Sequence, residues 1–215
     1  MSKFFVEGSV KLLLSSLQDN EIFLSEDDLK FSLARLLEKC DNVSNVIVEY
    51  PILASELYQK ENEENDDCKG ICYIDIYFEY KRKKHFIELK YKTKECKVVR
   101  HNINEFDLKE HGAISDNLYR IYKDIKRMER IKEIENGAKS YCFILTNEPG
   151  YWSPHNKSGT NISKVSLEDG KSTKEIIQYD EKDTIEINNS YNIEWIPYKN
   201  IENTTFKYLL IDMNT

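Results

Sequence analysis

Two periods of apolar residues run through the 215-residue chain and predict its regular elements. A helical period of three and four residues marks 25–39, where Ser25 and Asp28 form a capping box, and a longer stretch that ends at Asn136 and Gly137. Alternating or unbroken apolar runs mark strands at 45–51, 71–80, 85–92, 140–146, 192–198 and 206–213. The order helix, strand, strand, strand, helix, strand, with extra C-terminal strands, predicts an α/β fold: a central mixed sheet flanked by helices.

The length fits one domain, because domains commonly hold about 100 to 200 residues. We expect a single domain over 1–215, with its core at about 25–147 and a C-terminal extension of loops and strands over 148–215. The polar stretch 147–183 predicts long loops, and the composition of 56–69 is typical of an unstructured segment.

The strands 71–80 and 85–92 form a candidate hairpin that brings two carboxylates together. A tight turn centred on Lys81 and Arg82 would place Asp75 directly opposite Glu88, and Lys90 on the same face as Glu88. Opposed carboxylates are destabilising unless a cation lies between them, so this register predicts a divalent metal site with Lys90 beside it. Two alternatives stay open: a longer turn would shift the register, and Glu-x-Lys on a strand is commonly an exposed salt-bridged pair.

Asp75, twelve intervening residues and then Glu88-Leu89-Lys90 resemble the motif of the PD-(D/E)xK nuclease superfamily, which has the restriction-endonuclease-like fold. Ile74 stands where the family motif begins with proline. The resemblance covers about 25–146 and includes sequence segments similar to those of stand-alone bacterial members. The resemblance implies a metal-dependent endonuclease, a hydrolase acting on DNA. It further implies Mg²⁺, or Mn²⁺ in its place, on Asp75, Glu88 and the Leu89 carbonyl, with Lys90 at the attacking water.

Further residues are candidates for the same site. Glu26 points to the packed side of the first helix, where it either favours the helix N-terminus or adds a carboxylate to the site, and Glu49 is a weaker candidate of that kind. On the long helix, Lys123 and Arg127 either belong to a solvated face with internal ion pairs, which also holds Asp124, or contact phosphates.

The net charge of −7 and the pI near 5.3 argue against a protein that coats nucleic acid. Resolved along the chain, residues 81–100 hold nine Lys or Arg against two Glu, a balance of +7, so the remainder totals −14. Basic charge beside an acidic metal site suits phosphodiester hydrolysis, and we expect Lys92 and Lys94 to bind nucleic acid. The basic segment could equally protect a sheet edge from pairing.

The remaining expectations concern compartment and partners. No signal peptide and no apolar run of membrane-spanning length is visible, and the five cysteines are odd in number and irregularly spaced. We therefore expect a cytoplasmic, soluble protein with reduced thiols, DNA as its partner, no membrane and no disulfide-linked partner. A homodimer stays open, as do three other functions: a non-catalytic nucleic-acid or protein-binding module of the same fold, a nuclease directed at RNA or repair intermediates, and a structural interaction protein in which the Asp75, Glu88 and Lys90 pattern is a coincidence.

Overall fold

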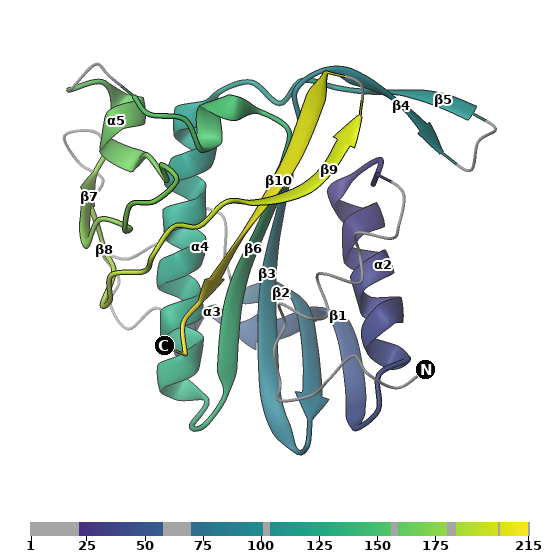
Figure 1. Cartoon of the computed structure of the whole chain (residues 1–215). Helices are drawn as coiled ribbons and strands as arrows, with labels where there is room; N and C mark the ends of the chain where they lie inside the picture. Colours follow the sequence, from purple (N-terminus) through teal and green to yellow (C-terminus); the bar gives the residue numbers. More distant parts are fainter. Residues whose placement is uncertain are drawn as a thin grey trace.

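A six-stranded mixed β-sheet forms the centre of the computed structural model, which describes residues 22–57, 70–100, 104–155, 159–179, 184–201 and 203–214. In sheet order the strands are β1 (Val43–Leu53), β2 (Ile71–Tyr80), β3 (Lys83–Lys92), β6 (Lys139–Thr146), β10 (Thr204–Asp212) and β9 (Ile196–Ile201). β3 and β6 run parallel, and the other neighbours run antiparallel (Figure 1). The predicted mixed α/β architecture is confirmed, and the extra C-terminal strands extend this sheet.

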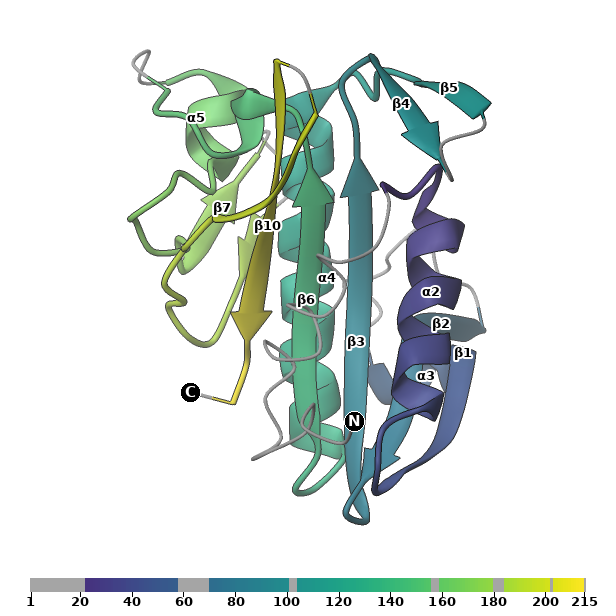
Figure 2. The same ribbon diagram turned by 45° about the vertical axis from the view of Figure 1, so that its right-hand side comes forward.

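Helices α2 (Glu26–Glu38) and α4 (Ile114–Ile134) cover opposite faces of the sheet (Figure 2). The apolar side of α2 packs with one cluster of buried residues, and that of α4, together with the short helix α3 (Ala54–Leu57), packs with another. The sheet therefore has a core on each face. In the described part of the chain, no helix combines the length and apolar character that a membrane crossing requires.

The start of α2 follows directly from its sequence. The Ser25 hydroxyl accepts a hydrogen bond from the Asp28 backbone N–H at 3.1 Å, so the predicted N-cap is confirmed. Leu29, Leu33 and Leu37 are fully buried on the side that faces the sheet. The cap and the apolar spacing together fix which residues of α2 face inward.

The β2–β3 hairpin has the predicted two-residue turn. Lys81 and Arg82 both adopt positive φ, 49° and 64°, which matches the twist of the flanking strands. The register runs from Tyr80 opposite Lys83 to Ile76 opposite Ile87, as expected, and then the ladder ends.

The first half of β2 leaves β3 because its side chains pack elsewhere. Ile76 belongs to the cluster under α2, whereas Cys72 and Ile74 pack in the cluster under α4 and α3. Asp75 and Glu88 are therefore not backbone partners, and a gap opens between the strands at this point.

Several short elements differ from expectation. The hairpin of β4 (Cys96–Arg100) and β5 (Asn104–Leu108) was not predicted, and 147–183 contains the 3-10 helix η2 (Pro149–Tyr151), α5 (Asn161–Val165) and β7 (Ile176–Gln178), which pairs with β8 (Thr184–Glu186). Each has three to five residues, too few to show an apolar period. Of the segment 56–69, residues 56 and 57 lie in α3 and 58–69 fall outside the described residues.

The cysteines depart from the expected reduced state at one position. Cys40, Cys96 and Cys142 are free thiols. Cys72 is buried and disulfide-bonded. The expectation of reduced thiols is therefore wrong for Cys72, while the three free thiols agree with it.

His85 makes the stability of the fold depend on pH. It is buried in β3, with its ring 4.7 Å from that of Phe78 and 6.0 Å from that of Tyr141. Burial, helped by nearby Lys139 and Lys83, lowers the pKa of His85 to about 4. An unfolded histidine has a pKa near 6.5, so between these values the unfolded chain binds more protons and stability falls as the pH falls.

We expect the free energy of unfolding to drop by about 2 kcal/mol through His85 between pH 7 and pH 5. Urea unfolding at both pH values measures this drop in the wild type and in His85→Phe, which retains an aromatic ring. The variant should lack this part of the pH dependence, and an equal drop in both proteins would contradict the assignment.

Candidate functional site

A cavity of about 420 Å³ opens where α4, β3, the first turn of α2 and the start of β2 meet. Most of the predicted site residues line it, and its walls are Glu26, Ile71, Tyr73, Glu88, Lys90, Lys92, Asn117, Arg120, Lys123, Asp124 and Arg127. The described fold thus brings together six of the residues expected from the sequence, drawn from three separate elements. Asp75, Leu89 and Lys94 are not among the residues that line it.

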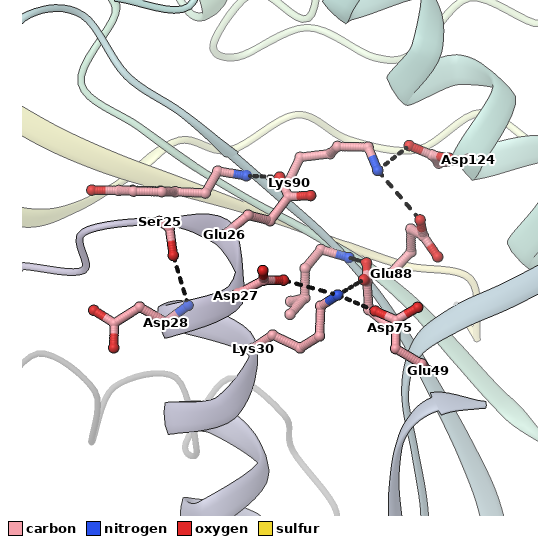
Figure 3. A network of polar contacts seen from close by, with 12 residues as sticks. Ser25, Glu26, Asp27, Asp28, Lys30, Glu49, Asp75, Glu88, Lys90 and Asp124 are labelled. Carbon is pink, nitrogen blue, oxygen red and sulfur yellow. Dashed lines mark hydrogen bonds and ion pairs between the residues drawn. The ribbon is translucent and has the colours of Figure 1, made fainter. Parts of the chain in front are cut away.

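Asp75 fills the gap that opens where β2 leaves β3 (Figure 3). Its Oδ2 accepts a hydrogen bond from the Leu89 N–H at 2.7 Å, in place of a β2 carbonyl, and its Oδ1 lies 2.9 Å from Lys30 Nζ. The N–H and C=O of one strand residue point to the same side, so the Leu89 carbonyl is also directed toward this gap. Asp75 and the Leu89 carbonyl therefore meet at one point of β3.

Glu26 binds the backbone of the same strand, β3, two residues beyond Leu89. Its Oε2 accepts a hydrogen bond from the Tyr91 N–H at 2.7 Å and lies 4.0 Å from Lys92 Nζ. Asp75 and Glu26 thus satisfy two amides of β3 that would otherwise lack a strand partner. Both carboxylates have a structural role in addition to the catalytic one expected of them.

Glu88 is buried, and its side chain extends toward α4, from the face of β3 opposite α2. Its Oε1 contacts Lys90 Nζ at 3.3 Å and forms a hydrogen bond with Arg127, while its buried Oε2 has no hydrogen-bond partner among the described residues. Burial raises the pKa of Glu88 above its usual range, an effect that Arg127 opposes and Asp75 and Asp124 reinforce. An unsatisfied buried oxygen in an otherwise paired cluster is a vacant acceptor for a cation or a water.

Lys90 shares the predicted face with Glu88 and lies between two carboxylates. Its Nζ is 3.1 Å from Asp124 Oδ2 and 3.3 Å from Glu88 Oε1 (Figure 3). Burial lowers the pKa of Lys90, but Asp124 and Glu88 more than offset this, so the pKa lies above its usual range. Lys90 is therefore held as an ammonium ion, which can hold a water or offset negative charge.

Lys30 and Asp124 are site residues that the sequence reasoning missed. Lys30 Nζ contacts Glu49 as well as Asp75, and Asp124 pairs with both Lys90 and Arg127. Asp124 was expected on a solvated face, but it is buried, and so is Lys30. Each is a charged residue on the apolar side of its helix, and that position was the available signal.

The basic residues of 81–100 do not act as one patch. The turn cations 81–84 lie at the far end of the hairpin, roughly 30 Å along β3 from Lys92, and Lys84 pairs there with Glu135 at 2.6 Å. Lys94 is exposed and its backbone N–H bonds to Asn147 outside the cavity wall. Instead, α4 supplies three of the five basic residues that line the cavity. The cavity is also lined by three carboxylates, so its basic groups exceed its acidic groups by two charges.

The donor set suits magnesium better than a tightly chelated metal. Among the described residues, no group of three or more His, Cys, Asp or Glu side chains is placed to hold a metal ion. Mg²⁺ commonly binds through one or two carboxylates and completes its shell with water and substrate phosphates. Asp75, Glu88 with its unpaired Oε2, and the Leu89 carbonyl offer three hard oxygen donors of this kind.

Two kinds of group therefore come together here. Glu88 on the cavity wall, with Asp75 beside it at Leu89, offers oxygen donors for a divalent cation, and ammonium and guanidinium groups on β3 and α4 can bind an anion. Ion pairs hold these groups together within the chain. No family model, curated protein or solved structure matches this chain, so a functional proposal rests on this geometry.

Proposed function

We propose that this protein is a metal-dependent nuclease that hydrolyses phosphodiester bonds in DNA through a PD-(D/E)xK-type site on a restriction-endonuclease-like core. The observation that carries the proposal is that Asp75 binds the Leu89 N–H, while Glu88 and Lys90 on either side of Leu89 pair with each other on the wall of a net basic cavity. Acidic donors for a metal beside cations for phosphate are the two requirements of such a reaction.

Asp75, Glu88 and the Leu89 carbonyl would hold Mg²⁺, with Mn²⁺ as a substitute. A bound ion of this kind polarises a phosphoryl oxygen and makes a water more acidic. Lys90 orients the attacking water and offsets the negative charge that develops on the phosphate. The hydrogen bond from Tyr91 to Glu26 keeps β3 in position for both.

The basic wall places the substrate. Lys92 and Lys123 bind phosphates that flank the scissile bond. Arg127, which pairs with Glu88 and Asp124 in the absence of substrate, exchanges Glu88 for a phosphate oxygen when DNA enters. This exchange leaves Glu88 available for the cation, because a guanidinium and a metal ion compete for the same carboxylate.

Incubation with plasmid and linear DNA tests the proposal. We expect nicked or shortened products with Mg²⁺ or Mn²⁺ and none after EDTA, because the carboxylates alone cannot supply the Lewis acid. Gel analysis of end-labelled substrates measures the rate, and RNA of the same sequence shows whether the enzyme accepts a 2′-hydroxyl. Equal product with and without EDTA would contradict a metal-dependent mechanism.

A non-catalytic binding module is the second candidate, and the internal ion pairs of the cluster favour it. Each of Asp75, Glu88 and Asp124 already contacts a basic side chain. Such a module has no need for a metal, so calorimetric titration with Mn²⁺ separates the two functions. Heat of binding that disappears in Asp75→Ala supports the nuclease, and its absence in the wild type supports the module.

A further inference from the structure

An exposed apolar strip borders the cavity, and the nuclease proposal leaves it unused. It consists of Pro51 and Leu53 on β1 and of Ile71 and Tyr73 on β2, which the strand register pairs as Leu53 with Ile71 and Pro51 with Tyr73. Leu53 and Tyr73 are each 51% exposed and Ile71 is 47% exposed. Alternate residues of the same strands, such as Ile52, face the core. The strip is thus a continuous apolar surface rather than a set of scattered side chains.

Two members of the strip enter the cavity. Ile71 and Tyr73 line it together with Lys92 of β3 and with Arg120 and Lys123 of α4. The cavity therefore offers an aromatic ring and an aliphatic side chain on β2 and cationic groups on the other elements. A flexible chain that carries both flat apolar rings and regularly spaced anions matches both surfaces at once.

The groups on the cavity wall favour one strand over two. The wall presents the ring of Tyr73 beside cationic side chains, and in a duplex the faces of the bases are covered by their neighbours in the stack. Only an unpaired strand can present a base face to Tyr73 while its phosphates stay near the α4 cations.

We infer that the cavity binds a single-stranded segment of nucleic acid, with a base stacked on Tyr73 and against Ile71 and with phosphates on Lys92, Arg120 and Lys123. This inference rests on the proposed function and narrows its substrate to unpaired strands, such as tails, flaps or gaps. Recognition depends on the base as well as on the phosphate, because the strip contributes no charge.

Fluorescence anisotropy in EDTA, where cleavage is blocked, tests the inference. The probes are a labelled 20-nucleotide oligo(dT), a duplex of equal length, and a 20-mer with a run of abasic sites that keeps the phosphates without the bases. We expect the wild type to bind oligo(dT) about 10-fold more tightly than either other probe. Tyr73→Ala should weaken oligo(dT) binding about 10-fold and abasic binding less than 2-fold, whereas Tyr73→Phe should bind like the wild type.

Phe31→Ala is the matched control, because Phe31 is 52% exposed on α2 but does not line the cavity. Its affinity for all three probes should stay unchanged. Duplex binding as tight as oligo(dT) binding, or an equal loss with the abasic probe in Tyr73→Ala, would overturn the inference. The proposed function fails separately: base-dependent binding without cleavage in Mg²⁺ refutes the nuclease alone, and cleavage of fully paired DNA that is indifferent to Tyr73→Ala refutes this inference alone.

Discussion

Replacement of Lys90 by methionine is expected to lower the rate of metal-dependent DNA hydrolysis by about 100- to 1000-fold, the usual cost of removing one charge-stabilising group from an active site. Lys90 Nζ lies within 3.3 Å of Glu88 and 3.1 Å of Asp124, where the ammonium is held beside the expected metal ligands. Methionine keeps the unbranched apolar stem, so the packing of β3 against α4 is preserved. Single-turnover cleavage at saturating protein measures the chemical step separately from binding.

The control for Lys90→Met is Lys97→Met, which makes the same change of charge on an exposed side chain of β4. Its cleavage rate should stay within 2-fold of the wild type. In Lys90→Met, Glu88 and Asp124 keep their ion pairs with Arg127 but lose those with Lys90. We therefore also expect this variant to unfold at a lower urea concentration. Both variants are therefore compared at a temperature where circular dichroism shows them folded. Cleavage by Lys90→Met at a rate within 3-fold of the wild type would contradict the assigned role.

The hairpin was predictable because its determinants are local. The alternation of side chains on 71–80 and 85–92 and a two-residue connection fix the register from Tyr80 and Lys83 to Ile76 and Ile87. The N-cap at Ser25 is local in the same sense. Where neighbouring residues decide a structure, the sequence reasoning reached the observed arrangement.

The end of the ladder was not predictable, because it depends on distant packing. Cys72 and Ile74 are drawn toward the cluster under α4, and the register that places Asp75 opposite Glu88 is lost just before it reaches them. The two carboxylates still come near one another, but Asp75 binds a backbone amide and a lysine from α2. Sequence periodicity indicates which residues are buried, and it does not indicate which helix they pack against.

The partners of the site residues were unpredictable for the same reason. Lys30 and Asp75, like Lys90 and Asp124, come from different elements and meet only in the folded chain. The charge run at 81–100 was misleading because a strand spreads its residues over about 3.3 Å each, which separates the turn from the site. The basic side chains that line the cavity come instead from β3 and α4.

Lys30→Met should be the most destabilising of the single substitutions considered, by about 3 kcal/mol. The Lys30 side chain is 8% exposed, and its ammonium contacts Asp75, whose side chain is 12% exposed. Without Lys30, Asp75 keeps the Leu89 N–H but loses the ammonium that lies 2.9 Å from its Oδ1 in a low-dielectric interior. Glu49 and Asp27 also contact Lys30, but their side chains are at least half exposed and contribute little. Urea unfolding of the variant and the wild type measures the loss.

The double variant Lys30→Met/Asp75→Asn distinguishes this cause from lost packing. Asparagine can still accept the hydrogen bond from Leu89, and it carries no charge that needs a partner, so the double variant should recover about 2 kcal/mol of the loss. Lys84→Met removes the more exposed pair with Glu135 and should cost less than about 1 kcal/mol. If the double variant lost as much as the two single variants together, the Lys30 ammonium and the Asp75 carboxylate would contribute to stability independently. Recovery would instead identify Lys30 as the cation that balances Asp75 in the absence of a metal, and Lys30→Met should then bind Mn²⁺ more tightly than the wild type, because the metal no longer competes with an ammonium for that carboxylate.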